Sequence, residues 1–254
     1  MILPVSFVFY RWLHDIQFNY ILVVVGFPLV DDNTTQVLTW TTTPWTLPSN
    51  MGVCVHPDFE YIKIHDELSG HNYILMEKRL TILYKDPKKA KFTILEKYKG
   101  SEMKDWKIVP MFDFFYEEFK DCAFKIMVDT YVTDDSGTGI VQNAPAFGED
   151  DYRVCLASGA ITADGHLPLP IDASGIFTDE VPDYKGMYVK DADKAIQKDI
   201  KAKGRLIIQS QFMHSYPFCW RSDTPLIYKA VPSWFVRVAP IVDKILACND
   251  QMRW

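Results

Sequence analysis

Hydrophobic residues in the first two thirds of the chain gather in short runs that Asp, Asn, Gly or Pro interrupt. The runs are rich in β-branched and aromatic residues, which is typical of β-strands. The most apolar stretch, Tyr20–Val30, has eleven residues. Because a helix needs about twenty apolar residues to cross a membrane, this stretch predicts a buried strand. The predicted strands are Val5–Phe9, Ile21–Val25, Val37–Trp40, Gly52–Val55, Tyr61–Ile64, Asn72–Met76, Phe92–Lys97 and Phe124–Tyr131.

Helical periodicity is clearest in Asp191–Lys203, which opens with acidic residues and stops before Gly204. Its apolar residues fall on one face of a helix, and they are Ala192, Ala195, Ile196 and Ile200. Shorter helices are predicted at Glu77–Tyr84 and around Asp150–Ser158. Many strands with a few inserted helices favour an α+β fold, a β-barrel-like domain with inserted short helices, over a repeating βαβ sheet.

Composition places the chain among ordinary globular proteins, with 254 residues, 48% of them apolar, and a net charge of −6. A disordered or collagenous chain is excluded. The acidic balance argues against a general nucleic-acid binder, which needs a basic surface, but one local basic patch could still grip RNA. Lys85–Lys91 and Lys194–Arg205 are either such patches or solvated faces, and both interpretations stay open.

The five cysteines are scattered, odd in number and without a CxxC pair. This pattern is typical of free thiols in a reducing compartment, because zinc sites need paired thiolates and disulfide scaffolds are denser in Cys. We therefore expect no metal and no cofactor. The amino-terminal residues also lack the pattern of a secretory signal peptide.

Thr39–Asn50 (TWTTTPWTLPSN) is the first segment that could carry chemistry. Its two prolines rule out a regular helix or a central strand, so a strand over Val37–Thr41 should break into a rigid loop. We expect this loop to expose four hydroxyls, those of Thr41, Thr42, Thr43 and Thr46. They could contact a ribose, a carbonyl or an apolar substrate. The alternative is a strand end whose threonines only form local turns.

Gly137–Tyr152 (GTGIVQNAPAFGEDDY) is the second such segment. Gly137 and Gly139 flank Thr138 and allow the backbone to approach a ligand closely. The carboxylates that follow, Glu149–Asp151, could cap a helix, and one that faces a cleft could also hold an ammonium group. No GxSxG, HExxH or Walker A motif is found, so any hydrolysis would depend on positioning substrate and water.

Three blocks, Trp40–Asn50, Gly137–Val154 and His214–Val238, together resemble the editing domain of isoleucyl-tRNA synthetases. The third Thr and the Trp of TTTPWT favour the isoleucyl family over its valyl and leucyl relatives. GEDDYRVC and HSYPFCWRSDTPL are most similar to the eukaryotic cytoplasmic form, which implies a cytoplasmic location. The resemblance starts near Val37. It divides the chain into poorly matched strands at 1–36, an editing core at 37–209, and a segment at 210–254 that leads back towards the synthetic domain.

The resemblance implies hydrolysis of mischarged Val-tRNA(Ile), which is needed because a binding pocket rejects a slightly smaller side chain only weakly. Thr42 and Thr43 would contact the terminal adenosine and the ester, and Asp151 would hold the α-ammonium group. These three are the expected catalytic residues. The expected substrate-binding residues are Thr41, Trp45, Thr46, Gly137, Thr138, Gly139 and Gln142, with Thr46 in the side-chain pocket.

One position departs from the family pattern, which usually has His where this chain has Gln142. Glutamine forms hydrogen bonds but cannot act as a base near neutral pH. Either cleavage continues with altered sparing of Ile-tRNA(Ile), or the domain is a weakened or inactive tRNA-binding module.

The HIGH and KMSKS signatures of ATP-dependent activation are both missing from the sequence. We therefore expect no ATP chemistry and no amino-acid activation by this chain. It would be part of a larger enzyme, and a monomer when isolated. Its partners would be the 3′ end of tRNA(Ile) carrying valine and the remainder of the synthetase, with no membrane involved.

Overall fold

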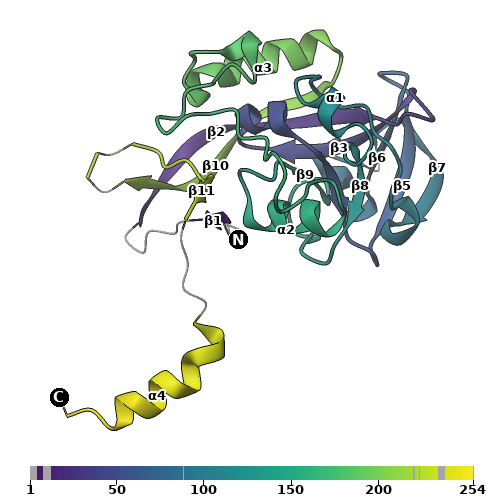
Figure 1. The fold of residues 1–254 in the computed structure, drawn as a ribbon. Helices are drawn as coiled ribbons and strands as arrows, with labels where there is room; N and C mark the ends of the chain where they lie inside the picture. Colours follow the sequence, from purple (N-terminus) through teal and green to yellow (C-terminus); the bar gives the residue numbers. More distant parts are fainter. Residues whose placement is uncertain are drawn as a thin grey trace.

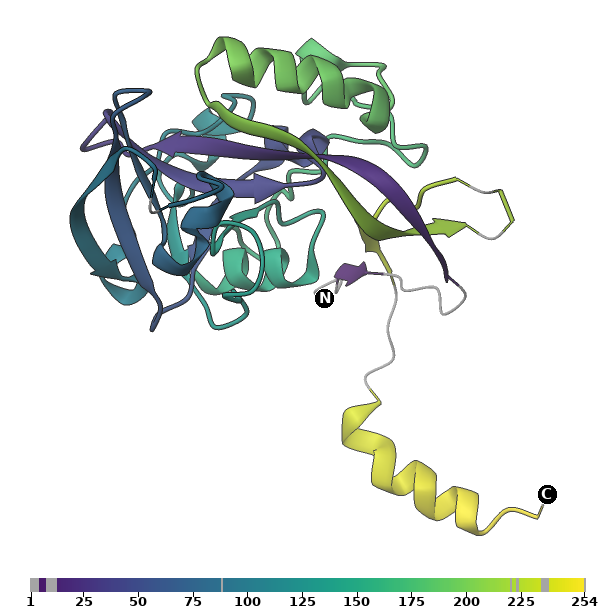
Figure 2. The same ribbon diagram turned by 180° about the vertical axis from the view of Figure 1, so that it is seen from behind.

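Two long antiparallel strands, β2 (Leu13–Pro28) and β10 (Leu206–Cys219), form the longest ladder of the fold and pair Leu13 with Cys219. The computed structural model describes residues 5–7, 13–87, 89–219, 221–222, 224–233 and 238–253. The twisted β2–β10 ribbon lies beneath α3 in both views (Figures 1 and 2). The expected buried strand at Tyr20–Val30 is confirmed up to Pro28 as the second half of β2, where Val23, Val24 and Val25 are fully buried. Val30 lies beyond the end of β2 and is 51% exposed, so the prediction was wrong for that residue.

This ribbon forms one edge of a six-stranded sheet with the strand order β10-β2-β3-β6-β5-β7. All its neighbours are antiparallel except β3 and β6, which run parallel with Thr35 opposite Asn72. The remaining strands of the sheet are β3 (Thr35–Thr41), β5 (Glu60–Asp66), β6 (His71–Met76) and β7 (Phe92–Lys99).

A smaller sheet of three strands has β4 (Gly52–Val55) in the centre, parallel to β8 (Lys125–Val128) and antiparallel to β9 (Ile140–Asn143). A two-stranded ladder joins β1 (Val5–Phe7) to β11 (Ala230–Pro232). The predicted α+β class is confirmed. Within the described residues both larger sheets are open and not barrel-like, because the outermost strands, such as β7 and β10, do not pair with each other.

Short helices fill the connections. The α-helices are α1 (Tyr116–Phe119), α2 (Glu149–Ala157), α3 (Val189–Ala202) and α4 (Val242–Asp250). The 3₁₀ helices are η1 (Pro44–Ser49), η2 (Glu77–Ile82), η3 (Gly100–Met103), η4 (Pro182–Tyr184) and η5 (Ala239–Ile241). Among the described residues no helix has the length and apolar character needed to cross a bilayer. The predicted helix at Glu77–Tyr84 forms as η2, a tighter 3₁₀ turn.

Helix α3 confirms the prediction from its apolar spacing. Ala192, Ile196 and Ile200 are fully buried along one face together with Val189, whereas the fourth predicted residue, Ala195, is partly buried and packs against the core. The helix ends before Gly204, whose φ of +69° belongs to the left-handed region that glycine adopts at low cost. Figure 1 shows α3 above the β2–β10 ribbon, whereas α4 lies apart from the sheets. Helix α3 therefore covers the ribbon at the place where the threonine-rich segment ends.

The hydrophobic core has two parts that lie on opposite faces of β2. Val23 and Val25 belong to the larger cluster, which the three-stranded sheet and α3 share. Val24 belongs to a smaller cluster with Leu38 and Ile62. Because both faces of β2 are covered around Val24, the stretch Ile21–Val25 is a continuous apolar run without the usual alternation of apolar and polar residues.

We expect Leu38→Ala to lower the free energy of unfolding by about 3 kcal/mol, because it leaves a cavity in the smaller cluster. Leu38 is fully buried, whereas Leu68 lies in a turn and is 81% exposed. Leu68→Ala is the matched control and should change stability by less than about 0.5 kcal/mol. Urea unfolding of both variants measures the difference, and equal losses would contradict this account of the core.

Candidate functional site

The threonine-rich segment turns sharply at the end of β3. Pro44 occupies the first position of η1, where its missing N–H costs nothing and its fixed φ suits the helix. The Thr43 N–H donates to Thr41 Oγ1 at 3.0 Å, and the Thr46 hydroxyl donates to the Thr43 carbonyl at 2.9 Å. These local bonds match the turn-forming interpretation of the threonines, and they hold the segment in one conformation.

The expected exposure of this segment is wrong for Thr41 and Thr46, which are 7% and 4% exposed. The reason is that η1 turns back into the core and does not project as a loop. Trp45 is 3% exposed and meets the Phe147 ring edge to face, with the ring centroids 4.8 Å apart. Thr42 and Thr43 are half-buried, so they are the threonines of the segment that a ligand could reach.

Gln142 connects this segment to the small sheet. Its amide Nε2 donates to Thr46 Oγ1 at 3.0 Å, and its Oε1 accepts from Asn50 Nδ2 at 3.0 Å. The Gln142 side chain is only 8% exposed, and both the N–H₂ and the oxygen of its amide have hydrogen-bond partners within the protein. Gln142 lies on β9 opposite Val53 of β4, and this register fixes its position relative to η1.

Asp151 lies in the first turn of α2, but it does not cap that helix. The N-cap residue is Gly148 and makes no side-chain capping bond. The Asp151 carboxylate instead accepts from Asn143 Nδ2 at 3.2 Å and from the Ala144 N–H at 3.1 Å. Asp151 therefore makes no side-chain capping bond, although it lies near the positive end of α2 as expected, and its carboxylate contacts the end of β9.

Burial raises the pKa of Asp151 to about 7, and the neighbouring Asp150 adds to the rise. The hydrogen bonds from Ala144 and Asn143 oppose the rise, because they favour the ionised carboxylate. Tyr131, whose hydroxyl accepts from Asn143 Nδ2 at 2.9 Å, has its pKa raised by burial and by Asp151. The site therefore holds a carboxylate that can change charge near neutral pH.

Hydrogen bonds run from Thr43 through Thr46 and Gln142 to Asn50. Asn50 Nδ2 also donates to the Asn143 carbonyl at 3.3 Å, and the Asn143 amide donates to Asp151. Sequence reasoning missed Asn50 and Asn143, although they lie inside the two segments it had chosen. Asn50 Oδ1 and Asn143 Oδ1 are buried acceptors that have no hydrogen-bond partner within the described part of the chain. The arrangement offers fixed acceptors and hydroxyls, with no strong base beside them.

The Gly137–Gly139 turn lies outside this hydrogen-bonded set. Gly137 and Gly139 have φ values of +56° and +75°. A Cβ atom at Gly137 would overlap the Trp40 indole, and one at Gly139 would lie 2.6 Å from Met76. Thr138 is fully buried and donates to the Ile140 carbonyl at 3.2 Å. We expected these glycines to let a ligand approach the backbone closely. The side chains of Trp40 and Met76 occupy that space instead.

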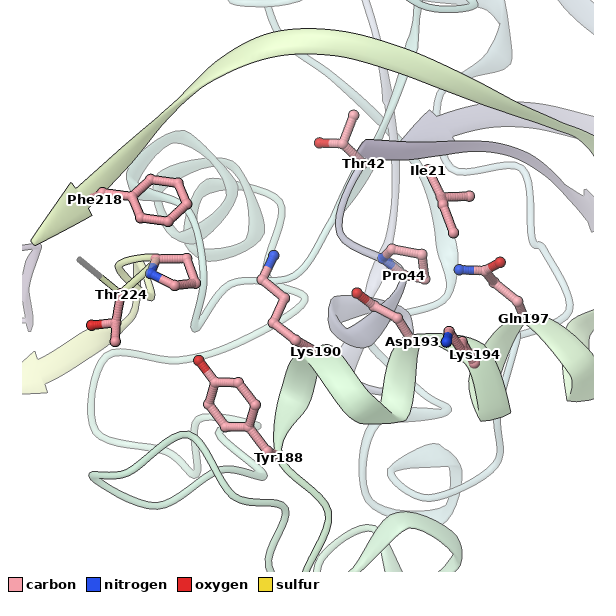
Figure 3. A pocket seen from close by; sticks show the side chains of 11 residues that line it. Ile21, Thr42, Pro44, Tyr188, Lys190, Asp193, Lys194, Gln197, Phe218 and Thr224 are labelled. Carbon is pink, nitrogen blue, oxygen red and sulfur yellow. The ribbon is translucent and has the colours of Figure 1, made fainter. Parts of the chain in front are cut away.

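A cavity of about 540 Å³ opens on the other side of η1, against α3 and β10. Figure 3 shows Thr42 and Pro44 on one wall and Lys190 and Asp193 on another. The Asp193 carboxylate accepts from the Trp45 N–H at 2.9 Å, and burial raises its pKa to about 7. No set of three or more His, Cys, Asp or Glu side chains in the described residues could hold a metal ion.

Comparison with known proteins identifies the family. No protein-family profile matches the chain. The cytoplasmic isoleucine–tRNA ligase of Saccharomyces cerevisiae is 53% identical over 232 residues, which are 91% of this chain and 22% of that protein. The cytoplasmic isoleucine–tRNA ligase of Mus musculus is 52% identical over 232 residues, 91% of this chain and 18% of that protein. The chain belongs to the isoleucyl-tRNA synthetase family. It spans about a fifth of the length of these relatives.

Solved structures of synthetase editing domains share the fold. The crystal structure of GlLeuRS-CP1 aligns with a TM-score of 0.56 at 14% identity, covering 74% of this chain and 99% of that one. The Plasmodium falciparum cytosolic leucyl-tRNA synthetase editing domain aligns with a TM-score of 0.53 at 13% identity, covering 77% and 99%. The predicted resemblance to isoleucyl-tRNA synthetases of the cytoplasmic type is confirmed, and the fold is that of these editing domains.

The raised pKa of Asp151 predicts a pH-dependent stability. The pKa of Asp151 is about 7 in the folded chain and 3.8 in the unfolded chain, so the folded state binds this proton more tightly. The stability that comes from the protonated Asp151 carboxyl is therefore fully present below pH 3.8 and is lost as the pH rises through 7. The stability of the unchanged chain relative to Asp151→Asn should therefore fall between about pH 4 and pH 8. Urea unfolding across this range measures it. Asp183→Asn, at an exposed position of η4, is the control. Parallel profiles for Asp151→Asn and the unchanged chain would contradict the assignment.

Proposed function

We propose that this chain is an editing domain that hydrolyses the ester of mischarged Val-tRNA(Ile) in the cytoplasm. The observation that carries the proposal is the hydrogen-bonded set linking Thr43, Gln142 and Asp151. Membership of the isoleucyl-tRNA synthetase family and the fold of leucyl-tRNA synthetase editing domains support it.

The α-ammonium group of the aminoacyl ester would bind at Asp151. A cation there replaces the lost hydration of the carboxylate and lowers its pKa again, so the ionised form returns on binding. Asn143 Oδ1, a buried acceptor still lacking a donor among the described residues, belongs to the side chain that already bonds Asp151. A carboxylate beside an open amide oxygen suits a group that donates three hydrogen bonds.

The terminal adenosine and the ester would lie over Thr42 and Thr43, the two half-buried threonines. Thr41 holds this surface in place, because its hydroxyl lies 3.2 Å from that of Thr43. Thr46 and Gln142 would form the end of the side-chain pocket. Trp45 and the Gly137–Gly139 turn act as support, because the indole of Trp45 packs in the core and the turn packs against Trp40.

Hydrolysis at this site depends on positioning. A water oxygen forms a bond with the ester carbonyl carbon, the bond from that carbon to the ribose oxygen breaks, and the water's proton passes to the ribose oxygen. Valine and the tRNA leave. The α-ammonium group makes the carbonyl more electrophilic, and holding ester and water together supplies most of the remaining gain. The threonine hydroxyls can stabilise charge on the carbonyl oxygen.

The rest of the synthetase is the proposed partner of the segment at 210–254, and the 3′ end of tRNA(Ile) is the proposed partner of the editing core at 37–209. The strand β10, Leu206–Cys219, runs through the boundary at 209 and pairs with β2, which lies in the 1–36 segment. We therefore propose that the first and last segments act together as a monomer's connection to the synthetic domain.

Asp151→Ala should reduce deacylation of Val-tRNA(Ile) by about a hundredfold or more, because the ammonium loses its charged partner. Glu149→Ala is the matched control, since Glu149 is an exposed carboxylate in the same turn of α2. It should keep the full rate. Circular dichroism checks that both variants are folded. A near-normal rate for folded Asp151→Ala would refute the ammonium-anchor role.

Gln142→His should make the domain spare Ile-tRNA(Ile) more strongly, raising its preference for Val-tRNA(Ile) by about tenfold, the scale of discrimination by one methylene. An imidazole has a different shape from the amide and would give the pocket a different end wall. Gln211→His, on the exposed part of β10, is the control. Identical preferences in all three chains would exclude a role for this position. Tight tRNA binding with no turnover by any of them would favour the tRNA-binding module.

A further inference from the structure

Both N–H groups of the Asn143 side-chain amide have acceptors within the protein. Nδ2 donates to the Tyr131 hydroxyl at 2.9 Å and to Asp151 Oδ1 at 3.2 Å. The amide is planar, and its oxygen lies on the other arm from its nitrogen. Because Nδ2 faces Tyr131 and Asp151, Oδ1 is directed away from both. This oxygen is the buried acceptor for which the described residues provide no donor.

The two acceptors of the Asn143 amide have different effects on it. The ionised Asp151 carboxylate only accepts, so it turns the nitrogen of the amide towards itself. A single hydrogen bond still lets the amide swing about the line of that bond. The second bond, to the Tyr131 hydroxyl, fixes the plane of the amide and with it the place of Oδ1. A phenylalanine at position 131 would leave one buried N–H group without its acceptor.

Tyr131 is itself held by a contact with α2, the helix that carries Asp151. The Tyr131 backbone N–H donates to Asp129 Oδ1 at 3.0 Å. The Arg153 guanidinium donates to both oxygens of Asp129, at 2.7 and 3.0 Å, and its central carbon lies 5.9 Å from the centre of the Tyr131 ring. Paired bonds of this kind fix the angle as well as the distance. Arg153 lies two residues after Asp151, so the contacts form a closed ring through α2.

This support does not depend on the charge of Asp151. Arg153 holds the pKa of the Asp129 carboxyl below its usual range, so Asp129 stays ionised at neutral pH. Burial raises the pKa of Tyr131, so its hydroxyl stays protonated and neutral. Asp151 is the member of the ring whose charge changes near neutral pH. Tyr131 therefore keeps the Asn143 amide in place both before and after Asp151 ionises.

We propose that Tyr131 is a positioning residue for the α-ammonium group of the aminoacyl ester. It acts through Asn143, whose Oδ1 it holds in the place where that oxygen and the Asp151 carboxylate accept from the same ammonium group. This inference rests on the proposed function, which places the ammonium group at Asp151. Acceptors that are already fixed lose little conformational freedom when the ligand binds, so the ammonium group is bound more tightly.

Two adenosine conjugates that cannot be hydrolysed isolate the contact with the ammonium group. Both carry an amide in place of the ester at the ribose. One bears a valyl group, and the other an isovaleryl group of the same carbon skeleton without the ammonium. Each is titrated into the unchanged 254-residue chain and into Tyr131→Phe, and NMR chemical shifts report the affinity.

The unchanged chain should prefer the valyl conjugate. Tyr131→Phe should weaken binding of that conjugate by about fivefold, the scale of one hydrogen bond, and leave the isovaleryl affinity unchanged. Equal weakening of both conjugates, the result of a merely structural role, would overturn the inference. The same holds if Tyr131→Phe weakens neither, or if the unchanged chain does not prefer the valyl conjugate.

A matched variant and a double-mutant cycle locate the effect. Tyr116→Phe is the control, because Tyr116 lies on α1 and is 39% exposed, and it should leave both affinities unchanged. Tyr131→Phe should have little further effect on the valyl conjugate when Asn143→Ala has already removed the amide. Fully additive losses would show that Tyr131 does not act through Asn143, and would refute the assignment. Circular dichroism checks that each variant is folded.

Deacylation of Val-tRNA(Ile), measured in parallel, separates this inference from the proposed function. If Tyr131→Phe selectively weakens the valyl conjugate but the unchanged chain hydrolyses no Val-tRNA(Ile), the positioning role stands and the editing activity is refuted. If the unchanged chain and Tyr131→Phe hydrolyse Val-tRNA(Ile) at equal rates and bind the valyl conjugate equally, the editing activity stands and the positioning role is refuted.

Discussion

The antiparallel pairing of β2 with β10 is the constraint on which the candidate site depends. Helix α3 ends just before β10 begins, and the Gly26 N–H of β2 donates to the Arg205 carbonyl at that junction, at 2.9 Å. The other edge of β2 pairs with β3, which ends at η1. One strand therefore holds α3 and η1 against each other. The bond from Trp45 to Asp193 closes this contact across 148 residues of sequence.

The small sheet places polar groups in the core at a cost that their mutual bonds reduce. Gln142, Asn50 and Asn143 are all less than a tenth exposed, and each makes at least one side-chain hydrogen bond. Buried amides without partners would each cost about 1–3 kcal/mol. Asp151, on α2 beside this sheet, costs the most free energy, because burial disfavours its charge. A fold that keeps such a carboxylate gives up stability at neutral pH, which is common where a charged ligand is held.

The sequence pattern predicts most elements, because strands and helices are encoded by local periodicity. The run at Tyr20–Val30 and the apolar face of α3 are examples. The exposure of Thr41 and Thr46 was predicted wrongly, since their burial depends on β9, which is about a hundred residues away. Barrel closure likewise depends on which strand edges meet, and local patterns carry no information about this. Asn50 and Asn143 were missed because a single polar residue looks the same whether it is solvated or buried.

The rigidity of η1 explains how an acidic domain could bind an anionic RNA end. A net charge of −6 gives no overall attraction for RNA, so the proposed site would depend more on its geometry than on charge. Pro44 and Pro48 restrict the backbone of η1, and local hydrogen bonds hold Thr43 and Thr46 in one conformation. A ligand that meets a surface already in place does not have to order it on binding. The prolines therefore matter for binding as well as for folding, because they keep the half-buried Thr42 and Thr43 in a fixed position for the terminal adenosine and the ester.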